Sequence, residues 1–354
     1  MRDYLYNLAT DKYRGILVFP LKSVLWVLSW IYGLALRILI WWRCRRPRQL
    51  GCKTISVGNI TVGGTGKTSL VEFICRYLID NGRKVAVLTR GYKKPRLASR
   101  KPRSAYETMG DEPYLLQKNL KNIVVIVDAN RLQGARQARD YYGVDTVVLD
   151  DGFQQWGIKK DLDIVAIDAT DPFGNRNMLP RGILREPLVA LKRADIFVLT
   201  KTNLNPDCQD IRDYLAGINP GALVAEAAHQ PIGCYELNRE KEFLDLAILK
   251  GKPLALFSGI ADPDSFENLI LSLGGEPALV FRFGDHHHYT RRDTERIINA
   301  SRSKGIGTVV TTEKDAVKLR QLYGEKPEAR ILVLRIALEI TRNEEKFLAR
   351  LLGL

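Results

Sequence analysis

A glycine-rich stretch between an apolar run and a helical pattern constrains this 354-residue chain more than any other feature. Residues 53–68 read Lys-Thr-Ile-Ser-Val-Gly-Asn-Ile-Thr-Val-Gly-Gly-Thr-Gly-Lys-Thr. The run Thr54–Val57 predicts a strand, and a helical pattern begins at Gly66. Strand, glycine-rich turn and helix in this order are the context of a phosphate-binding P-loop, where backbone N–H groups face an anion. A glycine-rich turn that holds no ligand is the alternative.

The residues of this loop are the predicted nucleotide-binding set. They are Thr61, Val62, Gly63, Gly64, Thr65, Gly66, Lys67 and Thr68. Lys67 would reach the β- and γ-phosphates, and the Thr68 hydroxyl would bind Mg²⁺. One position departs from the strict motif, because Thr61 stands where the first glycine is usual.

A second apolar run ends in two carboxylates. It reads Thr146-Val-Val-Leu-Asp-Asp151. In P-loop proteins such a strand carries the acid that holds Mg²⁺, directly or through water. Asp150 and Asp151 are therefore candidate metal-side residues, and capping of the next turn is the alternative.

Two further stretches carry titratable groups. Gly110-Asp-Glu-Pro113 begins a helical pattern, and spacing alone favours Asp111 as a helix cap over a catalytic base. Asp285 precedes three adjacent histidines, His286 to His288. Adjacent residues rarely converge on one metal ion, so a catalytic partner or phosphate ligand is the favoured interpretation of one of these histidines.

The formal net charge of +14 is concentrated in two segments. Residues 43–53 carry five positive side chains and residues 90–103 carry seven, and neither segment has an acid. This clustering indicates an anionic partner, although a solvated basic loop is the alternative for the second segment. The five cysteines are scattered without a CxxC pair, which favours a reducing compartment and no zinc site.

Residues 15–42 are apolar nearly all round and contain four of the five tryptophans. The lack of a small-residue cleavage site argues against a signal peptide. The uncharged run Ser23–Leu36 would span about 21 Å as a helix, short of the ~30 Å hydrocarbon core. An interfacial helix is therefore favoured, with Lys22 and Arg37 reaching outward and the basic cluster on anionic lipid. A spanning helix and a buried soluble helix are the alternatives.

From residue 53 onward, apolar strand-like runs alternate with helical patterns. Continuous apolar runs predict a sheet covered on both faces, so the fold class is α/β, a P-loop NTPase-like doubly wound sheet. We expect four segments: a membrane-associated segment at 1–50, the P-loop domain at 51–228, a connection or small ribbon at 229–252, and a smaller C-terminal α/β domain at 253–354.

Taken together, these stretches resemble the tetraacyldisaccharide 4'-kinase family of the lipid A pathway. The motifs that carry the resemblance run in order along nearly the whole chain: 56–68, 89–92, 110–113, 150–154, 179–187, 285–288 and 311–315.

The resemblance implies transfer of the ATP γ-phosphate to the 4'-hydroxyl of a tetraacylated glucosamine disaccharide 1-phosphate, with Mg²⁺, giving lipid IVA. It implies Asp111 as the base with His286 as its partner, and it makes Arg90 and Tyr92 candidate substrate-binding residues. It also implies attachment to the cytoplasmic face of the inner membrane. The interfacial interpretation of residues 15–42 favours a peripheral or monotopic attachment over a spanning one, and no nucleic-acid partner is expected. The sequence leaves the oligomeric state open.

If the resemblance is set aside, the residues allow two alternative functions. Thr200-Lys-Thr-Asn203 follows a strand and is similar to the guanine-reading motif of P-loop GTPases, although Asn203 stands where that motif has Asp. With the histidine cluster it suggests a GTPase or metal-insertion chaperone. The basic apolar N-terminus alternatively suggests a nucleotide-gated membrane adaptor that performs no chemistry.

Overall fold

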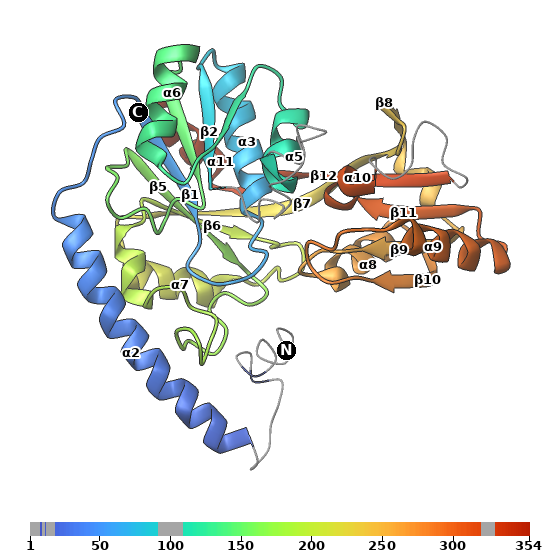
Figure 1. Ribbon diagram of the computed structural model, residues 1–354, viewed down its shortest axis with the longest axis horizontal. Helices are drawn as coiled ribbons and strands as arrows, with labels where there is room; N and C mark the ends of the chain where they lie inside the picture. The colour runs from blue at the N-terminus through green and yellow to red at the C-terminus, as the bar shows by residue number, and fades with distance from the viewer. Residues whose placement is uncertain (1–7, 9–10, 12–17, 91–108, 320–329) are drawn as a thin grey trace, which may run out of the picture. The chain divides into compact units, whose positions relative to one another are not determined.

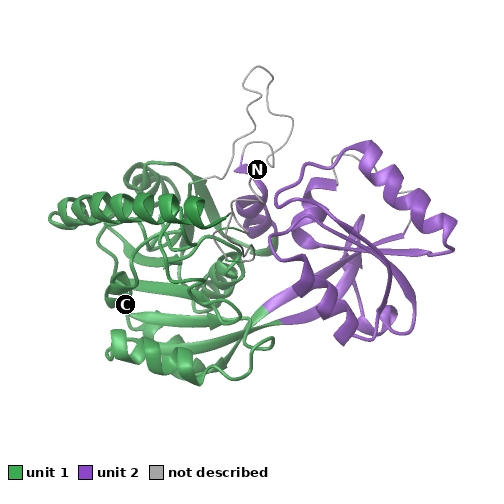
Figure 2. Ribbon diagram, turned by 90° about the horizontal axis from the view of Figure 1, so that it is seen from below, with its two compact units in different colours: residues 1–91, 119–229, 338–354 green, residues 92–118, 230–337 purple. Residues whose placement is uncertain are grey.

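The computed structural model describes residues 8, 11, 18–90, 109–319 and 330–354. The chain divides into two compact units (Figure 2). Unit 1 comprises residues 1–91, 119–229 and 338–354, and unit 2 comprises residues 92–118 and 230–337. The units are thus discontinuous in sequence, unlike the contiguous segments expected above. Two long strands, β7 (Leu223–Glu236) and β12 (Arg330–Arg342), run from one unit into the other.

Unit 1 is built on a parallel sheet with strand order β7-β6-β5-β1-β4-β2-β3. Besides the first part of β7, its strands are β1 (Lys53–Gly58), β2 (Val85–Thr89), β3 (Val124–Val127), β4 (Thr146–Asp150), β5 (Leu162–Asp168) and β6 (Ile196–Thr200). Every residue of β2, β4 and β6 is buried, which is typical of strands covered on both faces. The predicted doubly wound α/β fold is confirmed.

Helices cover this sheet (Figure 1). They are α3 (Lys67–Asp80), α6 (Arg131–Tyr142), α7 (Gln209–Ile218), the 3-10 helix η2 (Leu188–Arg193) and α11 (Glu344–Leu352). Helix α3 packs on β1, β2 and β4, and α6 packs on β2 and β3. The C-terminal helix α11 returns to α3, where the rings of Phe347 and Phe73 lie 6.3 Å apart.

Unit 2 has a smaller sheet in which β10, β9, β11 and β12 are parallel neighbours. Its further elements are α5 (Asp111–Asn119), β8 (Arg239–Leu244), η3 (Leu246–Leu249), β9 (Pro253–Ser258), α8 (Pro263–Ser272), β10 (Glu276–Arg282), α9 (Arg291–Ser303), β11 (Thr308–Thr312) and α10 (Glu313–Leu319). Strand β8 pairs antiparallel with β7 in the stretch where a connection or small ribbon was expected.

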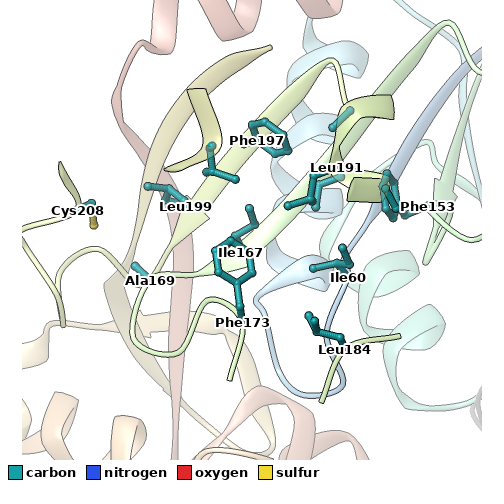
Figure 3. Close-up of a cluster of buried hydrophobic side chains, with 14 residues drawn as sticks. Ile60, Phe153, Ile167, Ala169, Phe173, Leu184, Leu191, Phe197, Leu199 and Cys208 are labelled. Atoms are coloured by element: carbon teal, nitrogen blue, oxygen red, sulfur yellow. The ribbon is translucent and has the colours of Figure 1, made fainter. Parts of the chain in front are cut away.

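An apolar cluster beneath one face of the unit 1 sheet anchors the loops that carry polar groups (Figure 3). Ile60 lies just before the glycine-rich loop, Phe153 just after Asp151, and Leu199 just before Thr200. These three side chains are at most 1% exposed. Because close-packed side chains resist displacement, the loops leave the sheet from fixed positions.

Helix α2 (Phe19–Cys44) precedes the sheet, and it is the helix among the described residues that is long and apolar enough to cross a membrane by length and composition. Its buried residues form a single stripe: Leu25, Ser29, Gly33 and Leu36. The other faces are apolar and exposed, with Trp30 and Trp42 each 67% accessible.

The buried stripe of α2 contacts the segment around residues 178–185. Ser29 Oγ lies 2.8 Å from the carbonyl oxygen of Met178 and accepts a 2.9 Å hydrogen bond from the backbone N–H of Arg181. Tyr32 donates its hydroxyl to the carbonyl of Arg185 at 3.0 Å. One side of α2 is therefore bound to protein over its middle part, from Leu25 to Leu36.

Candidate active site

The glycine-rich loop joins β1 to α3 and ends in a left-handed residue. Gly66 has φ +73° and is the N-cap of α3, and a Cβ there would lie 3.1 Å from His229 Cε1. Within the described residues, no side-chain hydrogen bond caps α3 and no acid lies in its first turn. The first backbone N–H groups of a helix need partners, so this end suits an anion.

The loop is fixed to a neighbouring segment by backbone hydrogen bonds. The N–H of Val62 donates to the carbonyl of Ile183 at 2.8 Å, and the N–H of Arg185 donates to the carbonyl of Ile60 at 2.7 Å. Thr61 is buried and forms an isolated β-bridge with Leu184. The position that departs from the strict motif is thus part of this backbone pairing.

The middle of the loop is exposed and the residue behind it is buried. Val62, Gly63 and Gly64 are accessible, whereas Thr65 is 3% exposed. The hydroxyl of Thr65 is buried and has no hydrogen-bond partner among the described residues. Such an atom fits a loop whose remaining partner is a nucleotide.

Asp150 is the last residue of β4, and Asp151 follows in a turn. The carboxylate of Asp150 is buried and accepts a hydrogen bond from Thr89 Oγ1 at 3.1 Å. Asp151 has φ +55°, and the next residue must be small, because a Cβ on Gly152 would lie 2.5 Å from Ser56 Oγ. The turn therefore separates the two carboxylates into different environments.

Two cations lie beside Asp151. Arg185 donates to its two oxygens at 2.7 and 3.0 Å, and Lys67 Nζ, on the first residue of α3, lies 3.8 Å from Oδ1. Burial raises the pKa of Asp151, but the Arg185 hydrogen bonds and the Lys67 charge outweigh burial and lower it. Asp151 is thus held ionised by groups that would also face a phosphate.

Arg131, the first residue of α6, is a functional candidate that the sequence did not indicate. It is 3% exposed, and its Nη1 donates to the carbonyl of Asp128, while its Nε has no hydrogen-bond partner among the described residues. Burial lowers the pKa of Arg131 below its ordinary value, and the charges of Asp150 and Asp151 offset this only in part. A buried guanidinium beside these carboxylates can receive an anionic ligand.

The oxygen ligands present fit Mg²⁺ better than a softer metal. No group of three or more His, Cys, Asp or Glu side chains that could hold a metal ion occurs in the part of the chain that the structure describes. A nucleotide-bound Mg²⁺ needs only one or two protein ligands, because phosphates and water complete its shell. Thr68 and Asp150 carry oxygens of the kind required, and Asp151 is engaged by Arg185.

Asp111 begins α5 in unit 2, and its carboxylate contacts side chains from two other segments of that unit. Its Oδ2 lies 3.2 Å from His286 Nδ1 and 3.4 Å from Lys318 Nζ. All three residues are at least partly buried. The structure brings the predicted pair together in one unit, with a lysine that the sequence did not indicate.

The other histidines of the run have different surroundings. His287 lies 3.3 Å from Asp293 and stacks on Phe283, and His288 is exposed. Adjacent side chains thus have separate partners, Asp111 for His286 and Asp293 for His287.

The remaining predicted residues are placed as follows. Arg90 is exposed after β2, and Tyr92 lies outside the described residues, as does most of the basic run 90–103. Thr200 Oγ1 lies 3.0 Å from the carbonyl oxygen of Thr65, and Lys201 pairs with Asp168 at 2.6 Å. The segment similar to the guanine-reading motif therefore supports the glycine-rich loop.

A parallel sheet whose first strand leads through a glycine-rich loop into an uncapped helix, beside a strand that ends in acids, defines a P-loop nucleotide-binding protein. The sequence model of a family described as tetraacyldisaccharide-1-P 4'-kinase matches residues 21–354. The chain belongs to this family of kinases.

Individual relatives agree. The chain is 37% identical over 341 residues to tetraacyldisaccharide 4'-kinase of Halothermothrix orenii, covering 90% of this chain and 88% of that protein. It is 38% identical over 280 residues to the Syntrophobacter fumaroxidans protein of the same name, covering 77% and 73%. A crystal structure of LpxK from Aquifex aeolicus in complex with ATP has a TM-score of 0.74 at 27% identity, covering 94% of this chain and 99% of that one.

Proposed function

We propose specific roles for the residues of this lipid kinase. As a member of its family, the chain transfers the γ-phosphate of ATP to the 4'-hydroxyl of tetraacyldisaccharide 1-phosphate in lipid A biosynthesis. The observation that carries the residue assignment is the Lys67–Asp151–Arg185 cluster at the uncapped start of α3. It gathers positive charge where the backbone already favours an anion.

The nucleotide roles follow from that cluster. The loop residues 61–68 would bind the triphosphate through backbone N–H groups other than that of Val62, which donates to Ile183, and Lys67 would lie against its terminal phosphates. Arg185 and Arg131 would stabilise the charge on the phosphoryl group during transfer. When bound, Mg²⁺ would neutralise the phosphate oxygens, and the Thr68 hydroxyl and the Asp150 carboxylate are the groups that would hold it.

Asp111 would accept the proton of the acceptor hydroxyl. Its contact with His286 at 3.2 Å supports this role, because a hydrogen-bonded imidazole fixes the carboxylate and can share the proton afterwards. A sugar hydroxyl is a weak nucleophile, so orientation and charge neutralisation supply most of the rate in phosphoryl transfer.

Helix α2 would lie in the headgroup region of the cytoplasmic leaflet of the inner membrane. Its protein-bound stripe, together with the exposed tryptophans on its other faces, supports a helix with one side in lipid. Replacing Trp30 and Trp42 by Ala should weaken co-sedimentation with vesicles containing anionic lipid. Unchanged co-sedimentation would contradict this orientation.

Phosphate transfer tests the proposed function directly. With γ-labelled ATP and tetraacyldisaccharide 1-phosphate in detergent micelles, label should enter the lipid, and the Arg131→Met and Arg185→Met variants should each lose at least tenfold in kcat. An exposed arginine of the same helix, Arg136→Met, is the matched control for the first variant. Full activity in both variants would remove these roles, and hydrolysis of GTP without lipid labelling would favour the GTPase alternative.

A further inference from the structure

A buried lysine in unit 2 lies between two carboxylates. The side chain of Lys318, near the end of α10, is only 3% exposed. Its Nζ lies 3.4 Å from Asp111 Oδ2 and 3.5 Å from Asp315 Oδ1. A buried ammonium is stable only where opposite charge and hydrogen bonds replace its water. The fold therefore holds the Lys318 ammonium at a fixed position beside Asp111, the proposed catalytic base.

Asp315 fixes the position of that lysine. Its side chain is completely buried, and its Oδ2 accepts hydrogen bonds from the N–H of Gly259 at 3.0 Å and from Thr312 Oγ1 at 2.8 Å. Gly259 follows β9 and Thr312 ends β11, so the carboxylate is tied to two neighbouring strands of the unit 2 sheet. The Lys318 ammonium is thus held in place by the sheet, through Asp315, although the aliphatic part of its side chain is flexible.

Among the described residues, the charged groups around Asp111 come from three elements. His286, in the loop between β10 and α9, contacts the same oxygen as Lys318 and lies 3.8 Å from Asp285 through its Nε2. On α5 itself the next residue, Glu112, pairs with Lys314 of α10 at 2.8 Å. The Oδ2 atom of Asp111 is therefore contacted both by an imidazole and by a lysine that Asp315 anchors.

We propose that Lys318, anchored by Asp315, is a positioning residue that holds the Asp111 carboxylate ionised and in one orientation for the acceptor hydroxyl. The inference rests on the proposed role of Asp111 as base. A cation 3–4 Å away favours the ionised carboxylate, and a restrained carboxylate loses less entropy on reaching the reactive geometry. Lys318 acts through Asp111 and need not touch substrate.

The experiment replaces Lys318 by Met in the full-length protein and measures lipid phosphorylation in micelles from pH 5 to pH 9. The value of kcat should fall at least tenfold while KM for ATP stays within twofold. The acid limb of the kcat profile should move to higher pH by about one unit, because removal of a nearby cation raises the pKa of a carboxylate. Lys318→Arg, which keeps the charge, should restore the acid limb.

The neighbouring lysine supplies a matched control. Lys314 lies on the same helix and its side chain is 40% exposed in its pair with Glu112. Exposed pairs of this kind contribute little, so Lys314→Met should leave kcat within twofold and the pH profile unmoved.

A second variant guards against misfolding. Lys318→Met leaves the buried Asp315 without its cation, whereas the double variant Lys318→Met with Asp315→Asn leaves that pair without charge and should fold. It should show the same loss of kcat and the same shift of the acid limb. Unchanged kcat and pH profile in the folded double variant, even with a lower Tm, would overturn the proposal in favour of a structural role.

Asp111→Asn, measured in parallel, separates the two proposals. An active Asp111→Asn would remove the base assignment and this inference with it. An inactive Asp111→Asn beside Lys318 variants that behave like the wild type would remove this inference alone.

Discussion

The nucleotide end of unit 1 and the Asp111 cluster of unit 2 hold charge in different ways. The first uses consecutive backbone groups of one loop, with Arg185 and Lys67 added around Asp151. The second uses side chains from three segments, with Lys318 tied to the sheet through Asp315. A backbone site depends on glycines and helix geometry, whereas a side-chain cluster depends on each of its members.

The largest effect should come from the side chain that completes the backbone site. Lys67→Ala should lower kcat by about 10³-fold, because a preorganised charge on the transferring phosphoryl group is lost. The labelled-ATP assay measures this loss, and Lys159→Ala, an exposed lysine of the same unit, is the control. A nearly normal rate in Lys67→Ala would mean that the backbone N–H groups of the loop suffice for phosphoryl transfer without the lysine. That result would contradict the role proposed for Lys67 and would make unit 1 a purely backbone site.

In the side-chain cluster of unit 2, Asp111→Asn should lower the kcat of the enzyme by about 10²- to 10⁴-fold, which is the range of general base catalysis. Asp293 is the control, because it is an aspartate of the same unit that forms a capping box with Thr290 at the start of α9. Asp293→Asn should cost about 1 kcal/mol of stability and leave kcat unchanged. If both variants behaved alike, Asp111 would return to a capping role.

A smaller effect should separate the two acids of unit 1. Asp150→Asn should raise the Mg²⁺ concentration needed for half-maximal activity about tenfold, because a direct or water-mediated ligand is weakened. Asp151→Asn should lower kcat about tenfold at unchanged Mg²⁺ dependence, because Arg185 and Lys67 lose their anchor. Titration of activity with Mg²⁺ measures both, and the reverse pattern would exchange the two roles.

The smallest expected effect concerns how the folding stability depends on pH. Burial raises the pKa of Asp293, but hydrogen bonds from Thr290 and His287 outweigh it and lower the value. A carboxylate whose pKa is lower in the folded than in the unfolded state stabilises the fold above the unfolded pKa of about 3.9. That contribution is lost as pH falls through the folded value. Urea midpoints should therefore fall below pH 4, and less steeply in Asp293→Asn; equal slopes would contradict this linkage.

Local signals explain what the sequence could predict. A few neighbouring residues are enough to indicate several elements. These are the glycine-rich loop, the strand that ends in Asp150, and the helices that begin near Asp111 and Arg131. Helix α6 spans Arg131–Tyr142, a stretch whose residue pattern is helical by itself. Strands β7 and β12 extend beyond their apolar first halves to Glu236 and Arg342, and the second half of β12 alternates between exposed and more buried residues, which is a weaker signal than a continuous apolar run.

The rest of the candidate site depends on tertiary structure. Lys318 and Arg131 carry no local pattern, and their importance follows from burial beside carboxylates that the fold brings close. Arg185 lies in a run that carried the family resemblance, 179–187, but its pairing with Asp151 follows from the backbone bonds between that run and the glycine-rich loop.

The one-sided attachment of α2 has a practical consequence for anyone who wants this enzyme without detergent. Deleting the helix would also remove Ser29 and Tyr32, which bind the segment that positions Arg185. Redesign of the outward surface is the better route: polar replacements at exposed positions such as Trp30, Ile38 and Trp42 would leave the inner stripe in place. Gly33 should be left alone, because a Cβ there would lie 3.2 Å from the sulfur of Met178.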